Sequence, residues 1–233
     1  AADGQPSDQG PRGSARLHHA VVLSSVTKRL KEYTEKLPSK KIQKAFSFYT
    51  GKTKISKLGE DYQEMMEINF NEWLVFDWVP DWRSMETLSQ IVLWGKIWEP
   101  TKEEKKILEK MNSAVVGVYE VKDVHPDTGI VIVEDLLFGG EYSVIDYSFS
   151  KSARKMSIFA LRLLNIDGIY VLSGCVYPFM PLDKNLVVSN IKHNYEIEKK
   201  ENEKHGVKRY NLHFYLKEYS HFIAQDWLAM MEV

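Results

Sequence analysis

Basic residues are concentrated in one segment near the beginning of the chain. The stretch from Lys28 to Lys57 holds ten Lys or Arg and two Glu, a net charge of +8, although the whole chain carries only −1. Tyr and Phe residues are interleaved with these cations. Cations bind phosphates and aromatic rings stack on bases, so the combination predicts contact with nucleic acid. The predicted nucleic-acid-binding residues are Lys28, Arg29, Lys36, Lys40, Lys41, Lys44, Lys52, Lys54 and Lys57.

An acidic segment follows and leaves two other interpretations open. The stretch from Glu60 to Pro100 holds nine Asp or Glu and two Lys or Arg, a net charge of −7. In one interpretation the basic segment docks on the acidic one. In the other it is a solvated helix face, as runs of charge usually are.

Three acidic residues of the second segment have the chemistry of a divalent-cation site. Hard cations prefer converging carboxylates, so Glu72, Asp77 and Asp81 suggest a metal-dependent nuclease or hydrolase. For Asp77 the alternative is a hydrogen-bonding role at the end of a helix. The two interpretations differ in whether the three side chains point toward one another.

Other catalytic and cofactor-binding patterns are missing from the sequence. His18 and His19 are adjacent, and His213 and His221 are eight residues apart, so the histidines do not follow a zinc-ligand spacing. There is no nucleophile elbow, phosphate-binding glycine loop or dinucleotide fingerprint. We therefore assign no catalytic and no metal-binding residue, expect no cofactor such as haem or a nucleotide, and favour a protein that is not an enzyme.

The single cysteine and the hydropathy pattern bear on the compartment. Cys175 cannot form an internal disulfide or a cysteine-type zinc site, and its apolar surroundings predict a small buried residue. No apolar run reaches the roughly 18–20 residues that span a bilayer, and no secretory signal is visible. We expect a cytoplasmic protein without a membrane partner. Residues 1–16, rich in Gly, Pro, Ser and Asp, are expected to be a flexible tail or tag.

Helices are predicted on both sides of the chain's centre. Apolar residues at steps of three and four predict helices over 17–37, 39–49, 60–78, 84–93 and 101–111. Ser39 and Ser84 are the predicted N-caps of two of them, and Thr101 with Glu104 fits a capping box. Near the C-terminus, Asp183 begins a helix that stops at Gly206. A last helix carries an aromatic stripe, which is either core or a partner-binding surface; its members are Tyr215, Tyr219, Phe222 and Trp227.

The central segment has the composition of strands. Val, Ile, Tyr and Phe dominate 115–124, 130–137, 142–147, 157–164 and 169–175, which are separated by glycine-containing turns. Consecutive hairpins imply antiparallel pairing. Two strands are apolar on both faces, so we expect a curled sheet or small barrel covered by helices. A loop beside it offers a possible binding edge made of Tyr142, Tyr147, Phe149, Lys151, Arg154 and Lys155.

The predicted fold is therefore α+β, with a helical N-terminal region, a central five-stranded antiparallel curled sheet or small barrel, and two C-terminal helices. Its expected parts are a tail at 1–16, a helical region at 17–112, a β unit at 113–181 and C-terminal helices at 182–233. Residues 17–233 are expected to form one compact domain.

Several motifs resemble those of one protein family. Glu72 to Asp77 (EWLVFD) is similar to the WLxFD segment of uncharacterised bacterial proteins that often carry a C-terminal SEC-C zinc motif. Glu134 to Gly139 (EDLLFG) and Leu163 to Gly174 (LLNIDGIYVLSG) resemble its DLLxG strand and its LSG hairpin. The resemblance covers about residues 60–181 and implies a fold rather than an activity. The SEC-C motif itself needs several cysteines, so this chain lacks the zinc module.

These observations favour a non-enzymatic binding or adaptor protein. Its first form is a nucleic-acid-associated accessory factor that uses the basic N-terminal helices. One alternative is a protein–protein interaction module, with a protein as the partner. The other is the metal-dependent nuclease or hydrolase.

Overall fold

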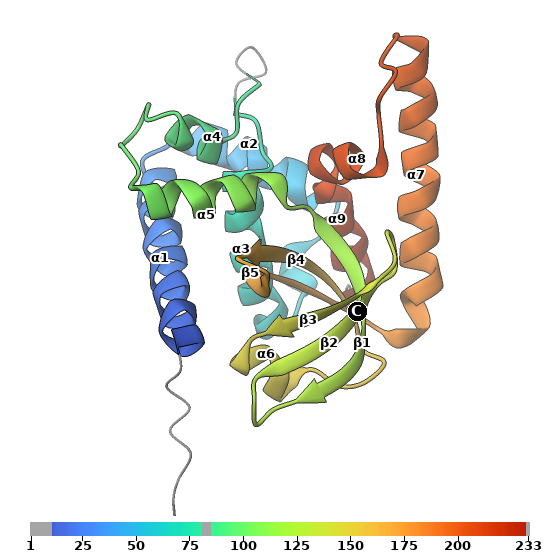
Figure 1. The fold of residues 1–233 in the computed structure, drawn as a ribbon. Coiled ribbons are helices and arrows are strands. Elements are labelled where there is room, and N and C mark those ends of the chain that lie inside the picture. Colours follow the sequence, from blue (N-terminus) through green and yellow to red (C-terminus); the bar gives the residue numbers. More distant parts are fainter. Residues whose placement is uncertain (1–10, 81–84, 232–233) are drawn as a thin grey trace, which may run out of the picture.

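The N-terminal part of the chain is helical in the computed structural model, which describes residues 11–80 and 85–231 (Figure 1). Its helices are α1 (Pro11–Thr34), α2 (Ser39–Thr50), the short 3-10 helix η1 (Ile55–Lys57), α3 (Glu60–Phe76), α4 (Leu88–Leu93) and α5 (Lys102–Ser113). The first of them begins within the segment that was expected to be a tail. No helix among the described residues is long and apolar enough to cross a membrane.

The ends of these helices agree only in part with the predicted caps. The Thr101–Glu104 capping box is confirmed, with each side chain bonded to the other residue's backbone N–H. Ser39 is not a cap, because the helix already begins there and Pro38 occupies the N-cap position. Ser84 lies outside the described residues, and Thr87 caps α4. Gly51 ends α2 with φ of +59°, a conformation that a residue with a Cβ rarely adopts.

Five strands follow, and they form one mixed sheet that curls into an irregular barrel. They are β1 (Val116–His125), β2 (Ile130–Asp135), β3 (Glu141–Ile145), β4 (Ile158–Ile166) and β5 (Ile169–Phe179), in the spatial order β1-β2-β3-β5-β4. The three predicted hairpins are antiparallel, and β4 also pairs with β1 in that way. The prediction of an entirely antiparallel unit was wrong at one contact, since β3 and β5 meet through a single parallel bridge, Val144 to Tyr170.

A short helix, α6 (Tyr147–Ser152), lies between β3 and β4 where the third strand was expected to continue. Asp146 caps it by accepting the backbone N–H of Phe149 at 2.7 Å. Phe149 and Ala153 pack with the inward-facing side chains of the sheet, and the ring of Phe149 meets that of Phe159 edge-on at 5.1 Å. The interior of the barrel is therefore an apolar core of its own.

Three further helices complete the chain, after the 3-10 turn η2 (Pro181–Asp183). They are α7 (Lys184–Lys204), α8 (Leu212–Glu218) and α9 (Ser220–Met231). The last predicted helix is thus divided in two at Tyr219, and Asp183 precedes α7 without a side-chain cap bond. The long α7 stands at the outer edge of the molecule (Figure 1).

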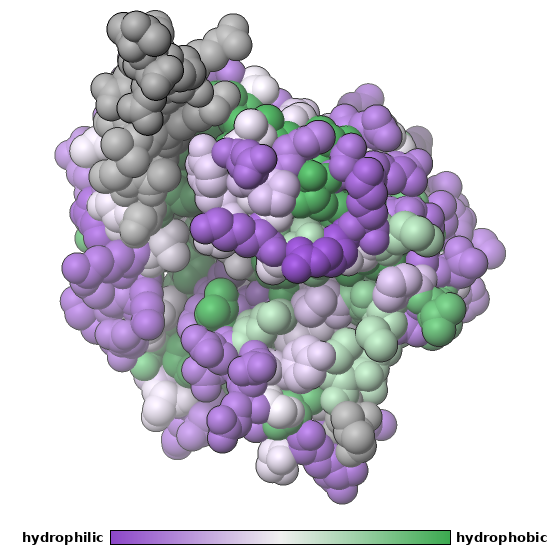
Figure 2. Space-filling model, turned by 90° about the horizontal axis from the view of Figure 1, so that it is seen from below, coloured by the Kyte–Doolittle hydropathy of each residue, from purple (hydrophilic) through white to green (hydrophobic). Residues whose placement is uncertain are grey.

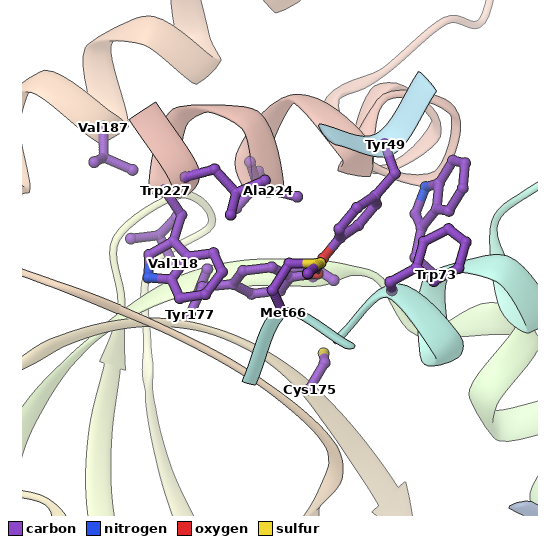
Figure 3. Close-up of a cluster of buried hydrophobic side chains, with 14 of the residues drawn as sticks. Tyr49, Met66, Trp73, Val118, Cys175, Tyr177, Val187, Ala224 and Trp227 are labelled. Carbon is purple, nitrogen blue, oxygen red and sulfur yellow. Dashed lines mark hydrogen bonds between the residues drawn. The ribbon is translucent and has the colours of Figure 1, made fainter. Parts of the chain in front are cut away.

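The largest core lies between the outside of the sheet and the helices. In Figure 3, Tyr49 of α2, Met66 and Trp73 of α3, and Ala224 and Trp227 of α9 surround Cys175 and Tyr177 of β5. The aromatic residues of the last helices belong to this core, since Tyr215 and Trp227 are buried. A separate cluster joins α1, α3, α4 and α5 to the end of β4. The helices therefore hold α3 and α2 firmly against the sheet.

Candidate functional site

Eight of the nine basic residues predicted to bind nucleic acid are exposed lysines. They are Lys28 and Lys36 at the end of α1, Lys40, Lys41 and Lys44 on α2, and Lys52, Lys54 and Lys57 beyond it. Apart from Lys54, none of them forms an ion pair within the described part of the chain. The structure therefore gives no support to docking of these seven lysines on the acidic segment.

Four residues share the outer side of α2. Lys40, Lys44 and Phe48 follow one another at steps of four, and Lys41 lies beside them, so the helical repeat places all four on one side. The opposite side is buried, and Tyr49 there is completely inaccessible. We call Lys40, Lys41, Lys44 and Phe48 the basic face of α2.

The aromatic member of this face is held in place while half of it stays open. Phe48 is 54% exposed. Its ring centroid lies 4.3 Å from that of His221 and 6.2 Å from that of Trp73. Gln225 of α9 donates a hydrogen bond from Nε2 to the carbonyl oxygen of Phe48 at 2.7 Å. The backbone at this end of α2 is thus tied to the last helix.

Arg29, the ninth predicted residue, has an intramolecular role. Its Nη1 donates to Glu104 Oε1 at 2.6 Å, and its guanidinium lies 4.3 Å from the ring centroid of Trp98. It therefore links α1 to α5 and is not available as the lysines are. Its partner, Glu104, is 75 residues away in the sequence, which is why the local pattern did not separate Arg29 from its neighbours.

The predicted acidic pair converges on a buried arginine that sequence reasoning missed. Arg162 of β4 is 1% exposed. Its Nε donates to Glu72 Oε1 at 2.8 Å and its Nη2 donates to Asp77 Oδ2 at 2.5 Å. Its Nη1 donates to the carbonyl oxygen of Ala114 at 2.7 Å. Asp81, the third residue of the suggested metal site, lies outside the described residues.

Asp77 is the centre of this network. Besides Arg162, Lys217 of α8 donates to its Oδ1 at 2.8 Å and Ser220 of α9 donates to its Oδ2 at 3.0 Å. Burial alone would raise the pKa of Asp77, but the adjacent Arg162 and Lys217 outweigh burial and lower it. Burial also lowers the pKa of Lys217, and Asp77 opposes that effect. One carboxylate thus joins α3 to β4, α8 and α9, in accordance with its predicted hydrogen-bonding role at a helix end.

A bulge in β5 encloses the other carboxylate. The register between β4 and β5 shifts around Arg162, so that three residues of β5 lie opposite one residue of β4. Ser173 Oγ and the backbone N–H of Cys175 donate to Glu72 at 2.8 and 2.9 Å. Between them Gly174 has φ of +133°. Glu72 is therefore fixed by hydrogen bonds as well as by Arg162.

This network suits a structural role better than metal chemistry. Arg162 and Lys217 balance the charges of Glu72 and Asp77, and the hydrogen bonds occupy the oxygens that a metal ion would need. Among the described residues, no three His, Cys, Asp or Glu side chains are grouped so that they could hold a metal ion. Cys175 is buried as predicted, and burial together with the nearby Glu72 raises the pKa of its thiol.

The expected binding edge near α6 is only partly a surface. Phe149 is buried and Tyr142 points into the barrel, so neither is exposed as predicted. Tyr147 is exposed, and Lys155 is paired with Asp123 at 3.0 Å. Arg154 donates to the carbonyl oxygens at the end of α6. The alternation of the strand explains the error, because it directs Tyr142 inward.

One signal in the sequence could have identified Arg162. It is the only charged residue in the apolar strand Ile158–Ile166, and an isolated charge among buried residues requires a partner of opposite charge. The identity of that partner could not be read locally, since Glu72 and Asp77 are 90 and 85 residues away.

Comparison with known proteins places the chain in a family. No curated protein and no solved structure matches it. The resemblance to SEC-C-associated proteins stays a prediction. Residues 23–221 match the model of a family of unknown function, DUF7986, and because this match covers most of the described helices and all of the strands, the chain belongs to that family.

Proposed function

We propose that this chain is a non-enzymatic binding protein that contacts single-stranded nucleic acid through the basic face of α2. One observation carries the proposal: three exposed, unpaired lysines share a helix face with a half-exposed phenylalanine. The opposite face of that helix is anchored in the largest core. The lysines supply charge for phosphates, and the ring supplies a surface for a base.

The charge on this face favours a polyanion. Lys40, Lys41 and Lys44 are close neighbours on one helix, so they repel one another in the free protein. A phosphate chain removes that repulsion and releases its own counterions. Each contact with a single strand contributes about −0.7 to the slope of log affinity against log salt, so three contacts contribute about −2.

The ring of Phe48 adds a contact that does not depend on salt. Its packing against His221 and Trp73 limits the freedom that it has to lose on binding. Stacking of one base on an aromatic side chain is worth about 1–3 kcal/mol. The two kinds of contact can therefore be separated by their salt dependence.

The test is the fluorescence anisotropy of a labelled single-stranded oligonucleotide, titrated with the full chain at several salt concentrations. The variant K40E/K41E/K44E is expected to lose binding. A matched control, K192E/K200E/K208E, makes the same change in net charge at three exposed lysines of α7 and the following loop, and it is expected to retain most of the affinity. Equal affinities for the two variants, or no binding by the native chain at low salt, would refute the proposal.

Phe48→Ala provides the second arm of that experiment. We expect affinity to fall about 5- to 150-fold, the equivalent of one stacked base, while the salt slope stays as in the native chain. A change in slope instead of affinity would mean that Phe48 acts through the placement of the lysines.

A second candidate function, docking of a protein, is favoured by an exposed apolar group. Met156 precedes β4 and Met180 follows its partner β5, and Leu182 is next in η2; they are 67%, 64% and 95% exposed. Seen from below, hydrophobic surface appears among hydrophilic side chains (Figure 2). A partner that stays bound after nuclease treatment, and is lost on Leu182→Glu, would support this function.

A further inference from the structure

A cluster of three tyrosines and one aspartate lies inside the barrel at the end of β2. Tyr119 of β1 is the direct cross-strand partner of Asp135, and both are buried. Tyr142 of β3 pairs with the inward-facing Val133, and Tyr170 of β5 bridges to the other end of β3. Partners across strands point to the same side of a sheet, so all four side chains face the interior. We call Tyr119, Asp135, Tyr142 and Tyr170 the tyrosine–aspartate cluster.

Asp135 is a buried carboxylate without a cation. Its Oδ1 accepts the backbone N–H groups of Leu137 and Phe138 at 2.8 and 2.9 Å. No hydrogen bond reaches Oδ2 from the described residues, and no Lys, Arg or His in them pairs with this carboxylate. Burial raises the pKa of Asp135, against the lowering effect of the two N–H groups. Buried charges are normally paired, so this site lacks a positive group.

The three rings surround the same place with faces of negative potential. Tyr119 and Tyr142 lie 6.4 Å apart at 81°, and Tyr142 and Tyr170 lie 4.8 Å apart at 59°. Gly117 makes room for this arrangement, because a Cβ at its position would lie 2.8 Å from the hydroxyl of Tyr119. Tyr142 and Tyr170 are partly exposed, so a ligand can reach them from solvent.

We propose that the tyrosine–aspartate cluster binds a quaternary ammonium group. Such a cation is attracted both by ring faces and by a carboxylate, and its methyl groups suit an apolar surrounding. A hard metal ion would need more oxygen ligands than one carboxylate offers. The group is either part of a small molecule such as choline or the side chain of a trimethylated lysine. This site is separate from the basic face of α2 and independent of its function.

The test is a calorimetric titration of the full chain with choline and with its neutral isostere 3,3-dimethylbutan-1-ol, which has the same shape but no charge. Choline is expected to bind at least about tenfold more tightly than the alcohol. A third titration uses the amide of N-acetyl-trimethyllysine, and the tighter of the two cations identifies the source. Equal affinity for choline and the alcohol, or no binding by either cation, would overturn the proposal.

Two pairs of variants separate binding from folding. Asp135→Asn keeps an oxygen for the N–H groups of Leu137 and Phe138 while removing the charge, and it should weaken choline binding at least about tenfold. Tyr142→Phe keeps the ring and should bind as the native chain does, whereas Tyr142→Leu should not. Unchanged choline affinity in Asp135→Asn would contradict the role of the carboxylate. The K40E/K41E/K44E variant should bind choline normally, so failure of one proposal leaves the other standing.

Discussion

Replacement of Arg162 by methionine is the most direct test of the buried network. Methionine has a similar length and no charge, so the change removes a cation without opening a large cavity. It leaves Glu72 and Asp77 buried, 9% and 2% exposed, with Asp77 still bonded to Lys217 but Glu72 without any cation. The fold itself provides no water to replace the lost partner.

The expected loss follows from the burial of the pair. Removal of one partner from a buried ion pair costs about 3–5 kcal/mol, because the remaining charge is left uncompensated. The total stability of a domain is about 5–15 kcal/mol, so Arg162→Met should consume a large part of it. For a chain of this size, that loss lowers the melting temperature by about 6–20 °C.

The exposed pair of Lys106 and Asp167 provides the matched control. Lys106 Nζ lies 2.6 Å from Asp167 Oδ1, a distance comparable to those around Arg162, but the two side chains are 44% and 54% exposed. Exposed pairs contribute about 0–1 kcal/mol. Lys106→Met should therefore lower stability by less than about 1 kcal/mol although it also deletes the cation of an ion pair.

Urea denaturation followed by circular dichroism measures both variants. The midpoint should fall strongly for Arg162→Met and little for Lys106→Met, with a similar dependence on urea. The pKa of Asp77 is lowered in the fold, so the unfolded state binds more protons in acid, and the stability from this carboxylate is present above its ordinary pKa of 3.8 and lost as the pH falls below it. The difference between Arg162→Met and the native chain should therefore shrink in acid. If the two variants lose equal stability at neutral pH, the network does not act as the structure indicates.

Two further predictions concern groups around this network. His221 is buried with its Nδ1 unpaired, and burial lowers its pKa to about 4, against the opposing effect of Asp77. Because the unfolded state takes up the proton first, the stability from neutral His221 is complete above pH 6.5 and falls by up to about 3 kcal/mol as the pH approaches 4. His221→Phe should flatten this part of the stability curve, and an unaltered curve would contradict the buried neutral imidazole. Gly174→Ala places a Cβ at φ of +133° beside Glu72 and should cost about 1–3 kcal/mol in urea denaturation, whereas an unchanged midpoint would show that the bulge relaxes freely.

Features that depend on local sequence were predicted well. The capping box at Thr101 and the termination of α2 at Gly51 need only residues a few positions apart. The hairpins follow from glycines that adopt positive φ, as at Gly168 with +83°. The order of helices and strands, and the α+β class with a curled central sheet, are therefore confirmed.

Features that depend on which elements meet were not predictable in the same way. Tyr142 was placed on a binding edge, and the register of the sheet directs it into the barrel. Arg29 was grouped with the exposed lysines, and α5 brings Glu104 to it. The parallel contact between β3 and β5 requires strands separated by a helix and a third strand to meet, which no hairpin signal encodes.

The sequence by itself determined the secondary structure, the position of the β-rich centre and the exposed lysines of α2, because helix periodicity, caps and turns act over a few residues. Only the tertiary structure decided that Glu72 and Asp77 face Arg162, and that three tyrosines gather around Asp135. The physical reason is that the worth of a charged or aromatic side chain depends on its burial and its partners. In this chain those partners come from elements far apart in the sequence.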